Sequence, residues 1–154
     1  MLYYCEKVVK SMRLTVYTDY SLRTLIYLGA KKQDELTTIQ EISDAYNISK
    51  NHLMKVTHQL GQLGYIETIR GRGGGIRLAK LPAHISIGEV VRQTEEDFHL
   101  VECFDPESNM CKIAPACQLK GVLAEALQAY LEVLDRYTVE DFLGNRNLLM
   151  QLLQ

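Results

Sequence analysis

One short run restricts the possible folds of this 154-residue chain more than any other feature: Gly71-Arg72-Gly73-Gly74-Gly75. The segments on either side, 65–70 and 76–79, alternate apolar and polar residues as β-strands do. Glycine adopts positive φ without steric cost, so the run can close a tight hairpin between them. A flexible linker or a phosphate-binding loop is the alternative, but a phosphate loop needs a following helix and a Gly-Lys-Ser/Thr sequence. The sequence therefore predicts a β-hairpin, with Arg70 and Arg72 projecting from it.

Two helices joined by a short turn are predicted directly before this hairpin. Thr38 and Glu41 have the spacing of a capping box, which opens the first of them. Ser49 can cap the second helix, which runs to Leu63 and is stopped by Gly64. Apolar residues recur along it at helical spacing, and its opposite face is polar. Two such helices followed by a hairpin predict a winged helix-turn-helix, in which the hairpin is the wing.

The rest of the chain is predicted to be largely helical, so the expected fold class is mainly α with one small β-hairpin. Upstream, Thr18 or Asp19 can cap a helix that precedes the helix-turn-helix. Downstream, Ser86 and Glu89 form a second capping box. A long helix follows over about 116–137, where apolar residues again recur at helical spacing.

This long helix carries a broad apolar stripe that requires a partner helix. We expect a second copy of the chain to be that partner, with packing inside the monomer as the alternative. A short helix is expected over 138–143, and the end of the chain, 145–154, is expected to be helical but weakly attached. The stripe consists of Leu119, Leu123, Ala126, Leu127, Tyr130, Leu131 and Leu134.

These elements divide the chain into four predicted parts. Residues 1–11 form an N-terminal extension that we expect to be disordered, and residues 12–82 form a winged helix-turn-helix DNA-binding domain. Residues 83–117 contribute a connecting helix and a loop that contains three cysteines. Residues 118–154 contribute the dimerisation helix and a C-terminal tail.

Charge is unevenly distributed along the chain. The formal net charge is −2, yet residues 48–80 hold six basic residues against one acidic residue, Glu67, which leaves −7 on the remainder. This asymmetry indicates a basic surface for nucleic acid on an acidic body, although an ordinary solvated face is the alternative. The six basic residues are Lys50, Lys55, Arg70, Arg72, Arg77 and Lys80.

Composition and patterning argue against several function classes. No run approaches the roughly 18 to 20 apolar residues that a membrane span requires. The first ten residues lack the apolar stretch of a secretory signal, so we expect a cytoplasmic protein with reduced thiols. No nucleophile–base pairing or paired catalytic carboxylates are recognisable, and the four histidines are scattered, so we expect no enzyme activity.

Three cysteines lie close together late in the chain, at Cys103, Cys111 and Cys117. The residues between them include two prolines and several turn formers, a composition typical of a loop. Cysteine used for packing prefers the protein interior, so three thiols in one loop indicate a bound group. Thiolates select zinc, copper(I) or iron–sulfur clusters, and these alternatives remain open from the residues alone.

The motifs together resemble the IscR/NsrR family of iron–sulfur winged-helix transcription regulators. The resemblance runs from Met12 to about Tyr137, with residues 1–11 extra, and we assign Cys5 no ligand role. The wider spacing between the first two loop cysteines is similar to the nitric-oxide-sensing branch of the Bacillus type. Its motifs are 14–23, 49–55, 70–75 and the three cysteines followed by a long helix.

The resemblance implies a homodimeric repressor with one 4Fe–4S cluster per subunit, and nitric oxide as the signal. Three ligands would be the loop cysteines, Cys103, Cys111 and Cys117, and the fourth would be Asp19 from the other subunit. A plain helix cap is the alternative role for that aspartate, and His99 is a rival ligand. Lys120 stands where IscR-type members carry a histidine ligand, which argues against that ligand set.

The implied DNA target is a partly palindromic operator, read by the helix after Ser49 in the major groove and by the wing in the minor groove. Alternative readings are a regulator that senses iron–sulfur status or thiol redox state, a zinc-binding regulator, and a cluster-carrying electron-transfer protein. The candidate DNA-contacting residues are Ser49, Lys50, Asn51, His52, Lys55, Arg70, Arg72 and Arg77, of which Lys50 and Arg77 are expected to contact phosphates.

Overall fold

The computed structural model of the protein describes residues 13–154. The predictions for the N-terminal extension and for Cys5 therefore lie outside the described residues. The order of elements is α1 (Val16–Ala30), α2 (Ile39–Tyr46), α3 (Lys50–Gln62), β1 (Ile66–Ile69), β2 (Gly75–Leu78), η1 (Pro82–His84), α4 (Ile87–Thr94), η2 (Glu102–Phe104), η3 (Ala114–Ala116), α5 (Gln118–Asp135), η4 (Val139–Phe142) and α6 (Arg146–Leu152).

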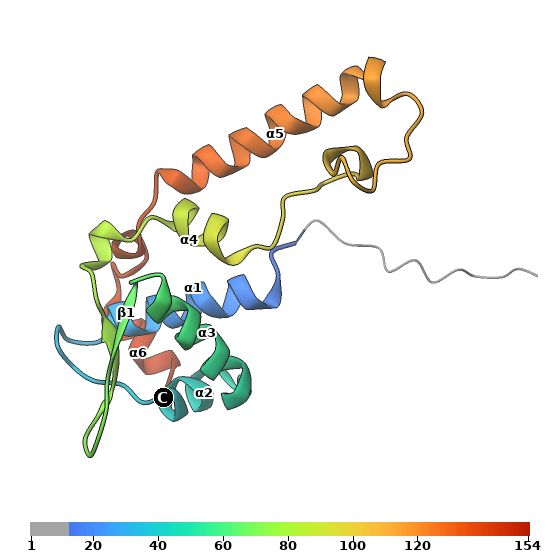
Figure 1. The fold of residues 1–154 in the computed structure, drawn as a ribbon. Coiled ribbons are helices and arrows are strands. Elements are labelled where there is room, and N and C mark those ends of the chain that lie inside the picture. The colour runs from blue at the N-terminus through green and yellow to red at the C-terminus, as the bar shows by residue number, and fades with distance from the viewer. Residues whose placement is uncertain (1–12) are drawn as a thin grey trace, which may run out of the picture.

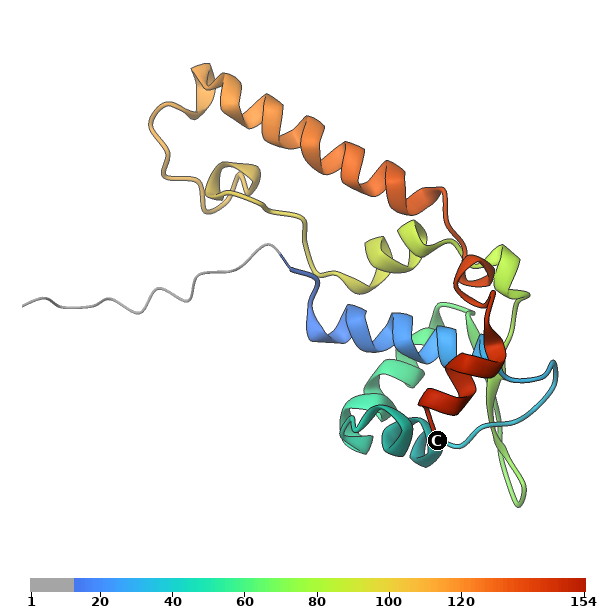
Figure 2. The same ribbon diagram turned by 180° about the vertical axis from the view of Figure 1, so that it is seen from behind.

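The elements form a body and a projecting arm (Figure 1). The body contains α1 to α3, the β-hairpin, α4 and the C-terminal segment, and the arm consists of α5 and the loop that precedes it. The opposite view shows the same separation, with the loop lying far from α2 and α3 (Figure 2). No helix within residues 13–154 is both long enough and apolar enough to cross a membrane.

The predicted N-cap of α1 is wrong. The helix begins at Val16, and the side chain of Thr15 caps it by accepting a hydrogen bond from the amide of Thr18. Thr15 is itself held by Glu95, whose Oε1 accepts from the Thr15 amide at 2.8 Å and from its hydroxyl at 3.0 Å. A carboxylate 80 residues away thus holds the residue that caps α1. Asp19 lies in the first turn, where a negative charge favours the helix dipole.

The helix-turn-helix forms as predicted. Thr38 and Glu41 make a complete capping box at the start of α2. The turn uses Asn47 at φ 52°, and α3 then begins at Lys50. Ser49 occupies the N-cap position of α3, but its side chain makes no capping hydrogen bond.

The hairpin also forms as predicted. Strands β1 and β2 pair antiparallel, with Glu67 opposite Arg77 and Ile69 opposite Gly75. Gly71 and Gly73 adopt φ of 100° and 75°, which a side chain would strongly disfavour. Gly75 lies so close to the backbone of Thr37 that an added Cβ would meet the Thr37 carbonyl oxygen at 2.8 Å. The glycine run therefore serves both the turn and the close packing of β2 on the loop before α2.

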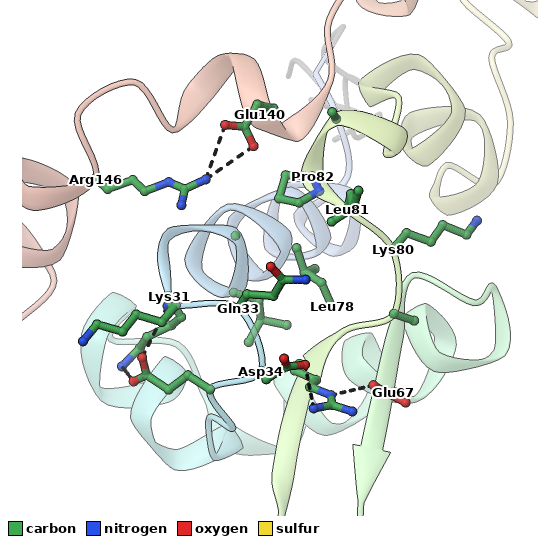
Figure 3. A pocket seen from close by; sticks show the side chains of 17 residues that line it. Lys31, Gln33, Asp34, Glu67, Leu78, Lys80, Leu81, Pro82, Glu140 and Arg146 are labelled. Carbon is green, nitrogen blue, oxygen red and sulfur yellow. Dashed lines mark hydrogen bonds and ion pairs between the residues drawn. The ribbon is translucent and has the colours of Figure 1, made fainter.

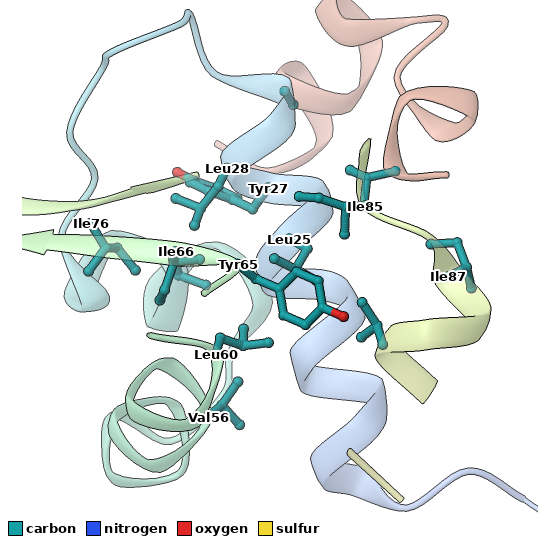
Figure 4. Close-up of a cluster of buried hydrophobic side chains, with 14 of the residues drawn as sticks. Leu25, Tyr27, Leu28, Val56, Leu60, Tyr65, Ile66, Ile76, Ile85 and Ile87 are labelled. Atoms are coloured by element: carbon teal, nitrogen blue, oxygen red, sulfur yellow. The ribbon is translucent and has the colours of Figure 1, made fainter. Parts of the chain in front are cut away.

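One apolar core joins the helix-turn-helix to the later elements. Figure 4 shows Leu25 of α1 among residues from α3, β1 and the segment that leads into α4, including Leu60, Tyr65 and Ile85. Leu25, Leu60 and Ile85 are fully buried. The predicted C-terminal helix forms as α6; Leu149, Met150 and Leu153 pack against this core, although no residue of α6 is fully buried.

The segment after α5 returns to α1 and closes this core. Val139 and Leu143 are buried, and a Cβ on Gly29 would lie 3.2 Å and 3.0 Å from their side chains. The short helix predicted for this segment forms as η4, where the Asp141 carboxylate accepts from the Thr138 amide at 2.7 Å and from the Thr138 hydroxyl at 3.0 Å. The absence of a side chain at Gly29 is what allows this close approach.

The apolar stripe of α5 is divided between two directions. Leu127, Leu131 and Leu134 pack against the core, whereas Leu119 and Tyr130 of the same predicted stripe are exposed. Val122 and Val133 extend this exposed face, so that it consists of Leu119, Val122, Tyr130 and Val133. We call this set the outer face of α5. Within the described chain, α5 packs inside the monomer only through the inner half of its stripe.

Candidate functional site

The exposed face of α3 is the first part of the candidate site. All five residues predicted here, Ser49 to His52 and Lys55, are exposed to solvent. The opposite side of the helix is fully buried through Leu53, Val56 and Leu60. Met54 is also exposed, by 45%, although the sequence analysis assigned it no role. Its position three residues after Asn51 is the signal that could have indicated one.

Two groups of contacts hold α3 in place. The Tyr17 hydroxyl of α1 donates to the carbonyl of Lys55 at 2.9 Å, and burial raises the pKa of that phenol. At the other end of α3, the side-chain amide of Gln59 donates to the carbonyl of Gln93 at 3.2 Å. The Tyr65 hydroxyl donates to the side-chain oxygen of the same Gln93 at 2.7 Å. The exposed face is thus presented by a rigidly held helix.

The wing is the second part of the candidate site. Arg70 and Arg72 are exposed, and neither forms an ion pair within residues 13–154. Arg77 differs, because its guanidinium lies 2.5 Å from Glu67 and 2.9 Å from Asp34. The hydrogen bond to Glu67 raises the pKa of Arg77. This arginine joins the two strands to the loop after α1, and its predicted phosphate contact would compete with both carboxylates.

The cysteine loop is the third part. Cys103 lies in η2, Cys111 in the following irregular segment, and Cys117 at the N-cap position of α5. All three are free thiols and half-buried. The predicted loop character is confirmed by local turns, in which Asp105 accepts from the amide of Glu107 at 3.0 Å and from the Ser108 hydroxyl at 2.6 Å. These bonds hold the pKa of Asp105 below its usual range, with the Ser108 bond as the main cause.

The predicted metal ligands are not gathered in one chain. Within the part of the chain that is described, no three His, Cys, Asp or Glu side chains lie close enough to share a metal ion. Asp19 is paired with Arg23, with Oδ2 to Nη2 at 2.8 Å and Oδ1 to Nε at 3.1 Å. His99 faces Asp97, with Nδ1 3.9 Å from Oδ1. By donor chemistry, three free thiols and a carboxylate suit an iron–sulfur cluster or another thiophilic metal.

The last turn of α4 and the residue after it contact α1, α3 and the C-terminal end of α5. Arg92 binds Asp135 at the end of α5, Gln93 accepts from Gln59 of α3 and from Tyr65 just before β1, and Glu95 accepts from Thr15 at the start of α1. Three neighbouring residues therefore contact the arm, α3 and the start of α1, the helix that carries Asp19. We call residues 92–95 the α4 junction.

A separate pocket of about 460 Å³ lies beside the base of the wing (Figure 3). Its walls come from the loop after α1, from β2, from η1 and from the C-terminal segment. Most of its charged groups are paired, with Lys31 on Glu35, Arg77 on Glu67 and Asp34, and Arg146 on Glu140. The residues that line it offer no pairing of a nucleophile with a general base.

Comparisons of sequence agree with this geometry. The sequence profile of the Rrf2 family, described as an iron-dependent transcriptional regulator, matches residues 14–145. A protein named HTH-type transcriptional regulator NsrR from Bacillus subtilis is 62% identical over 143 residues, which cover 93% of this chain and 98% of that protein. A protein of the same name from Bacillus licheniformis is 60% identical, over 92% of this chain and 99% of its own length.

Comparisons of structure agree as well. CymR, titled the global cysteine regulator of B. subtilis, superposes with a TM-score of 0.66 at 27% identity, covering 86% of this chain and 97% of that one. IscR of T. potens superposes with a TM-score of 0.70, covering 88% of each chain, and at 20% identity this likeness shows the fold alone.

The predicted winged-helix fold, the predicted regulatory class and the prediction that the chain is not an enzyme are confirmed by these relatives. The predicted resemblance is confirmed too, since curated proteins with the NsrR name match most of the chain. The family profile covers residues 14–145, and the structure has the helix-turn-helix, the hairpin and the projecting helix that these comparisons share. The chain therefore belongs to the Rrf2 family of transcriptional regulators.

Proposed function

We propose that this chain is a dimeric, cytoplasmic repressor that releases its operator when nitric oxide attacks a 4Fe–4S cluster held by its cysteine loop. The observation that carries the proposal is the position of three free, half-buried thiols on one irregular loop at the start of α5. That loop directly follows the α4 junction, in which Glu95 accepts hydrogen bonds from Thr15 at the start of α1, the helix that carries Asp19. The names of the most similar curated proteins support the same function.

DNA binding is assigned to the exposed face of α3 and to the wing. Lys50, Asn51, His52 and Lys55 extend from a helix whose other side is buried, as a helix in the major groove requires. Arg70 and Arg72 are free to enter a narrow minor groove, which attracts arginine. Ser49, at the start of α3, is assigned to a contact with the phosphate backbone of the DNA, since its hydroxyl is not used for capping.

The dimer is assigned to the outer face of α5. Its four large apolar side chains, led by Leu119 at 61% exposure and Val122 at 58%, are uncovered within the described chain. They lie on a helix that projects from the body, so a second copy can approach it without meeting the DNA-binding face (Figure 1). A twofold dimer of this kind suits a partly palindromic operator.

The cluster ligands are assigned to Cys103, Cys111 and Cys117 of one subunit and to Asp19 of the other. When bound, a 4Fe–4S cluster would supply iron centres that react with nitric oxide. The carboxylate of Asp19 is a harder ligand than the thiolates, which makes its bond the weakest of the set. In the described chain this carboxylate is occupied by Arg23, so ligation requires it to exchange an arginine for iron.

The regulatory effect follows from where these residues lie. Asp19 is in the first turn of α1. In the same turn, the hydroxyl of Tyr17 donates a hydrogen bond to the carbonyl of Lys55 in α3. A bond from Asp19 to the partner's cysteine loop would therefore fix the recognition helix of one subunit relative to the arm of the other. Loss of that bond would change the separation of the two recognition helices, and half-sites one helical turn apart tolerate little change.

Anaerobic purification followed by a DNA titration tests this function. We expect visible absorbance with matching iron and sulfide contents, tight binding to a duplex selected from a random pool, and release on stepwise addition of nitric oxide. Each of Cys103→Ala, Cys111→Ala and Cys117→Ala should abolish the absorbance, whereas Cys5→Ala, the matched control, should leave it unchanged. Equal DNA affinity with and without nitric oxide would overturn the proposal, and zinc in place of iron would overturn the cluster.

The fourth ligand needs its own comparison. Asp19→Ala should change the absorbance and accelerate the reaction with nitric oxide, while His99→Ala should leave both unchanged. If Asp19→Ala changes neither property and His99→Ala changes both, the ligand is the histidine of the cysteine loop.

A further inference from the structure

Met54 is the one large apolar side chain of α3 that the core does not use, within the described chain. Leu53, Val56 and Leu60 of the same helix are fully buried, whereas Met54 is 45% exposed and is not part of the cluster of buried core residues. Its carbonyl accepts a hydrogen bond from the Thr57 hydroxyl at 3.2 Å, but its side chain points away from the interior. Folding therefore does not explain an apolar residue at this position.

The position lies at the centre of the exposed face of α3. Residues three and four apart are neighbours on a helix surface, so Met54 adjoins Lys50 and Asn51 toward the start of α3 and His58 toward its end. Lys55, the next residue, is exposed beside it. A face that enters a groove with Asn51 and Lys55 must bring Met54 in with them.

The base edges in the major groove offer one apolar group, the C5 methyl of thymine. A methionine side chain is long, unbranched and polarisable, so it adapts to a contact of this size. We propose that Met54 is a specificity-determining residue that contacts the C5 methyl of one thymine in each half-site of the operator. This inference rests on the proposed placement of α3 in the major groove.

An exposed apolar residue of the wing could not recognise a thymine methyl group in the same way. Ile69 is also exposed, by 41%, and lies beside Arg70 at the end of β1. The minor groove, where the wing is placed, presents no methyl group, so an apolar side chain there cannot distinguish thymine from other bases in this way. Methyl recognition is therefore assigned to α3.

Replacement of thymine by uracil tests the contact directly, because it removes the methyl group and keeps the base pair. A duplex that the full-length protein selects from a random pool provides the operator. Each thymine is then replaced in turn, together with its symmetry mate, and the dissociation constants of the wild type and Met54→Ala are measured by fluorescence anisotropy at one salt concentration. Burial of one methyl group corresponds to about fourfold in affinity, so we expect roughly tenfold or more for the symmetric pair.

The result that supports the proposal is a coupling between one side chain and one position. At a single symmetric pair of thymines, uracil should weaken binding by the wild type and should not weaken binding by Met54→Ala. Leu81→Ala is the matched control, since Leu81 is an apolar residue of similar exposure, 52%, that lies outside the exposed face of α3. It should respond to every uracil as the wild type does.

Three other results would overturn the proposal. One is that uracil costs the wild type nothing at any position, and another is that it weakens both proteins equally. The third is that Lys50→Ala and Asn51→Ala leave operator affinity unchanged, which would remove α3 from the groove and with it the proposed function. If those two variants weaken binding but no uracil position distinguishes Met54→Ala, only the methyl contact fails. Unchanged thermal melting of Met54→Ala confirms that the fold is not the cause.

Discussion

The guanidinium of Arg92 on α4 binds the carboxylate of Asp135, the last residue of α5, through two parallel hydrogen bonds of 2.5 Å and 2.8 Å. This pair joins the arm to the body at the α4 junction. The side chains of Arg92 and Asp135 are 34% and 40% exposed, so solvent screens the pair. Its value lies in fixing the direction in which α5 leaves the body, because a bidentate pair restricts geometry more than a single bond.

Asp135→Asn should reduce the acid sensitivity of the protein. The hydrogen bond from Arg92 lowers the pKa of Asp135 in the folded state. A lowered pKa means that the carboxylate stabilises the fold above its unfolded pKa of about 4, and that this stabilisation is lost as the pH falls through the folded value. We therefore expect the melting temperature of the wild type to fall more steeply than that of the variant as the pH falls below about 5. Parallel curves in circular dichroism would contradict this account.

Gly88→Ala should destabilise the protein only when Asp135 is present. A Cβ on Gly88 would overlap the Oδ1 atom of Asp135 and displace it from Arg92. In an Asp135→Ala background that overlap disappears, and the better helix propensity of alanine should stabilise the fold by up to about 1 kcal/mol. Urea unfolding of the four proteins of this cycle measures the difference. Destabilisation of equal size in both backgrounds would show that Gly88 has another role.

Thr38→Ala should lower the free energy of unfolding by about 1 kcal/mol, because it removes the hydroxyl that caps α2. The Thr38 hydroxyl accepts from the amide of Glu41 at 3.2 Å, and the Glu41 carboxylate accepts from the Thr38 amide at 2.6 Å. Ser49→Ala is the control, since Ser49 has the same position at α3 but makes no side-chain capping bond. It should change stability much less, and chemical denaturation of both variants gives the comparison.

Arg72→Ala and Arg77→Ala should differ in how they alter DNA binding. Arg72 forms no ion pair within residues 13–154, so its removal should weaken binding to all DNA sequences. The slope of log K, the logarithm of the association constant, against the logarithm of the salt concentration should become smaller by about 1. Arg77 is held by Glu67 and Asp34, so its removal should instead loosen the wing and lower the melting temperature. A reduction of the slope by about 1 for Arg77→Ala as well would support the phosphate contact predicted from the sequence.

Val122→Glu should convert the dimer to a monomer. The substitution places a charge on the outer face of α5, where burial against a second copy would be costly. Gln128→Glu adds the same charge on the polar side of the helix, where Gln128 already bonds Glu132 at 3.1 Å, and should leave the dimer intact. Sedimentation equilibrium distinguishes the two. A dimer that survives Val122→Glu would place the interface elsewhere.

The elements that could be predicted from the sequence are those specified by nearby residues. The capping box of Thr38 and Glu41 and the glycines of the wing act within a few residues, so their patterns are visible in the sequence and the structure confirms them. The two-strand hairpin follows from the same local rules.

The elements that could not be predicted depend on contacts between distant residues. Glu95 contacts the residue that caps α1, and the return of the segment after α5 depends on the space left above Gly29. Neither partner is marked in the sequence. The exposure of Met54 could not be read from composition either, because an apolar residue on an amphipathic helix is normally assigned to the core.

The packing of Val139 and Leu143 over Gly29 has a consequence for incomplete polypeptides. A nascent chain already contains α3 long before these two residues leave the ribosome, yet its apolar core stays incomplete until they arrive. We expect a prematurely terminated product to be cleared by proteases, as a truncated chain expressed with a stop codon after Asp135 would show by its short half-life. Such a chain retains α3 and the three loop cysteines but lacks the two side chains that cover Gly29.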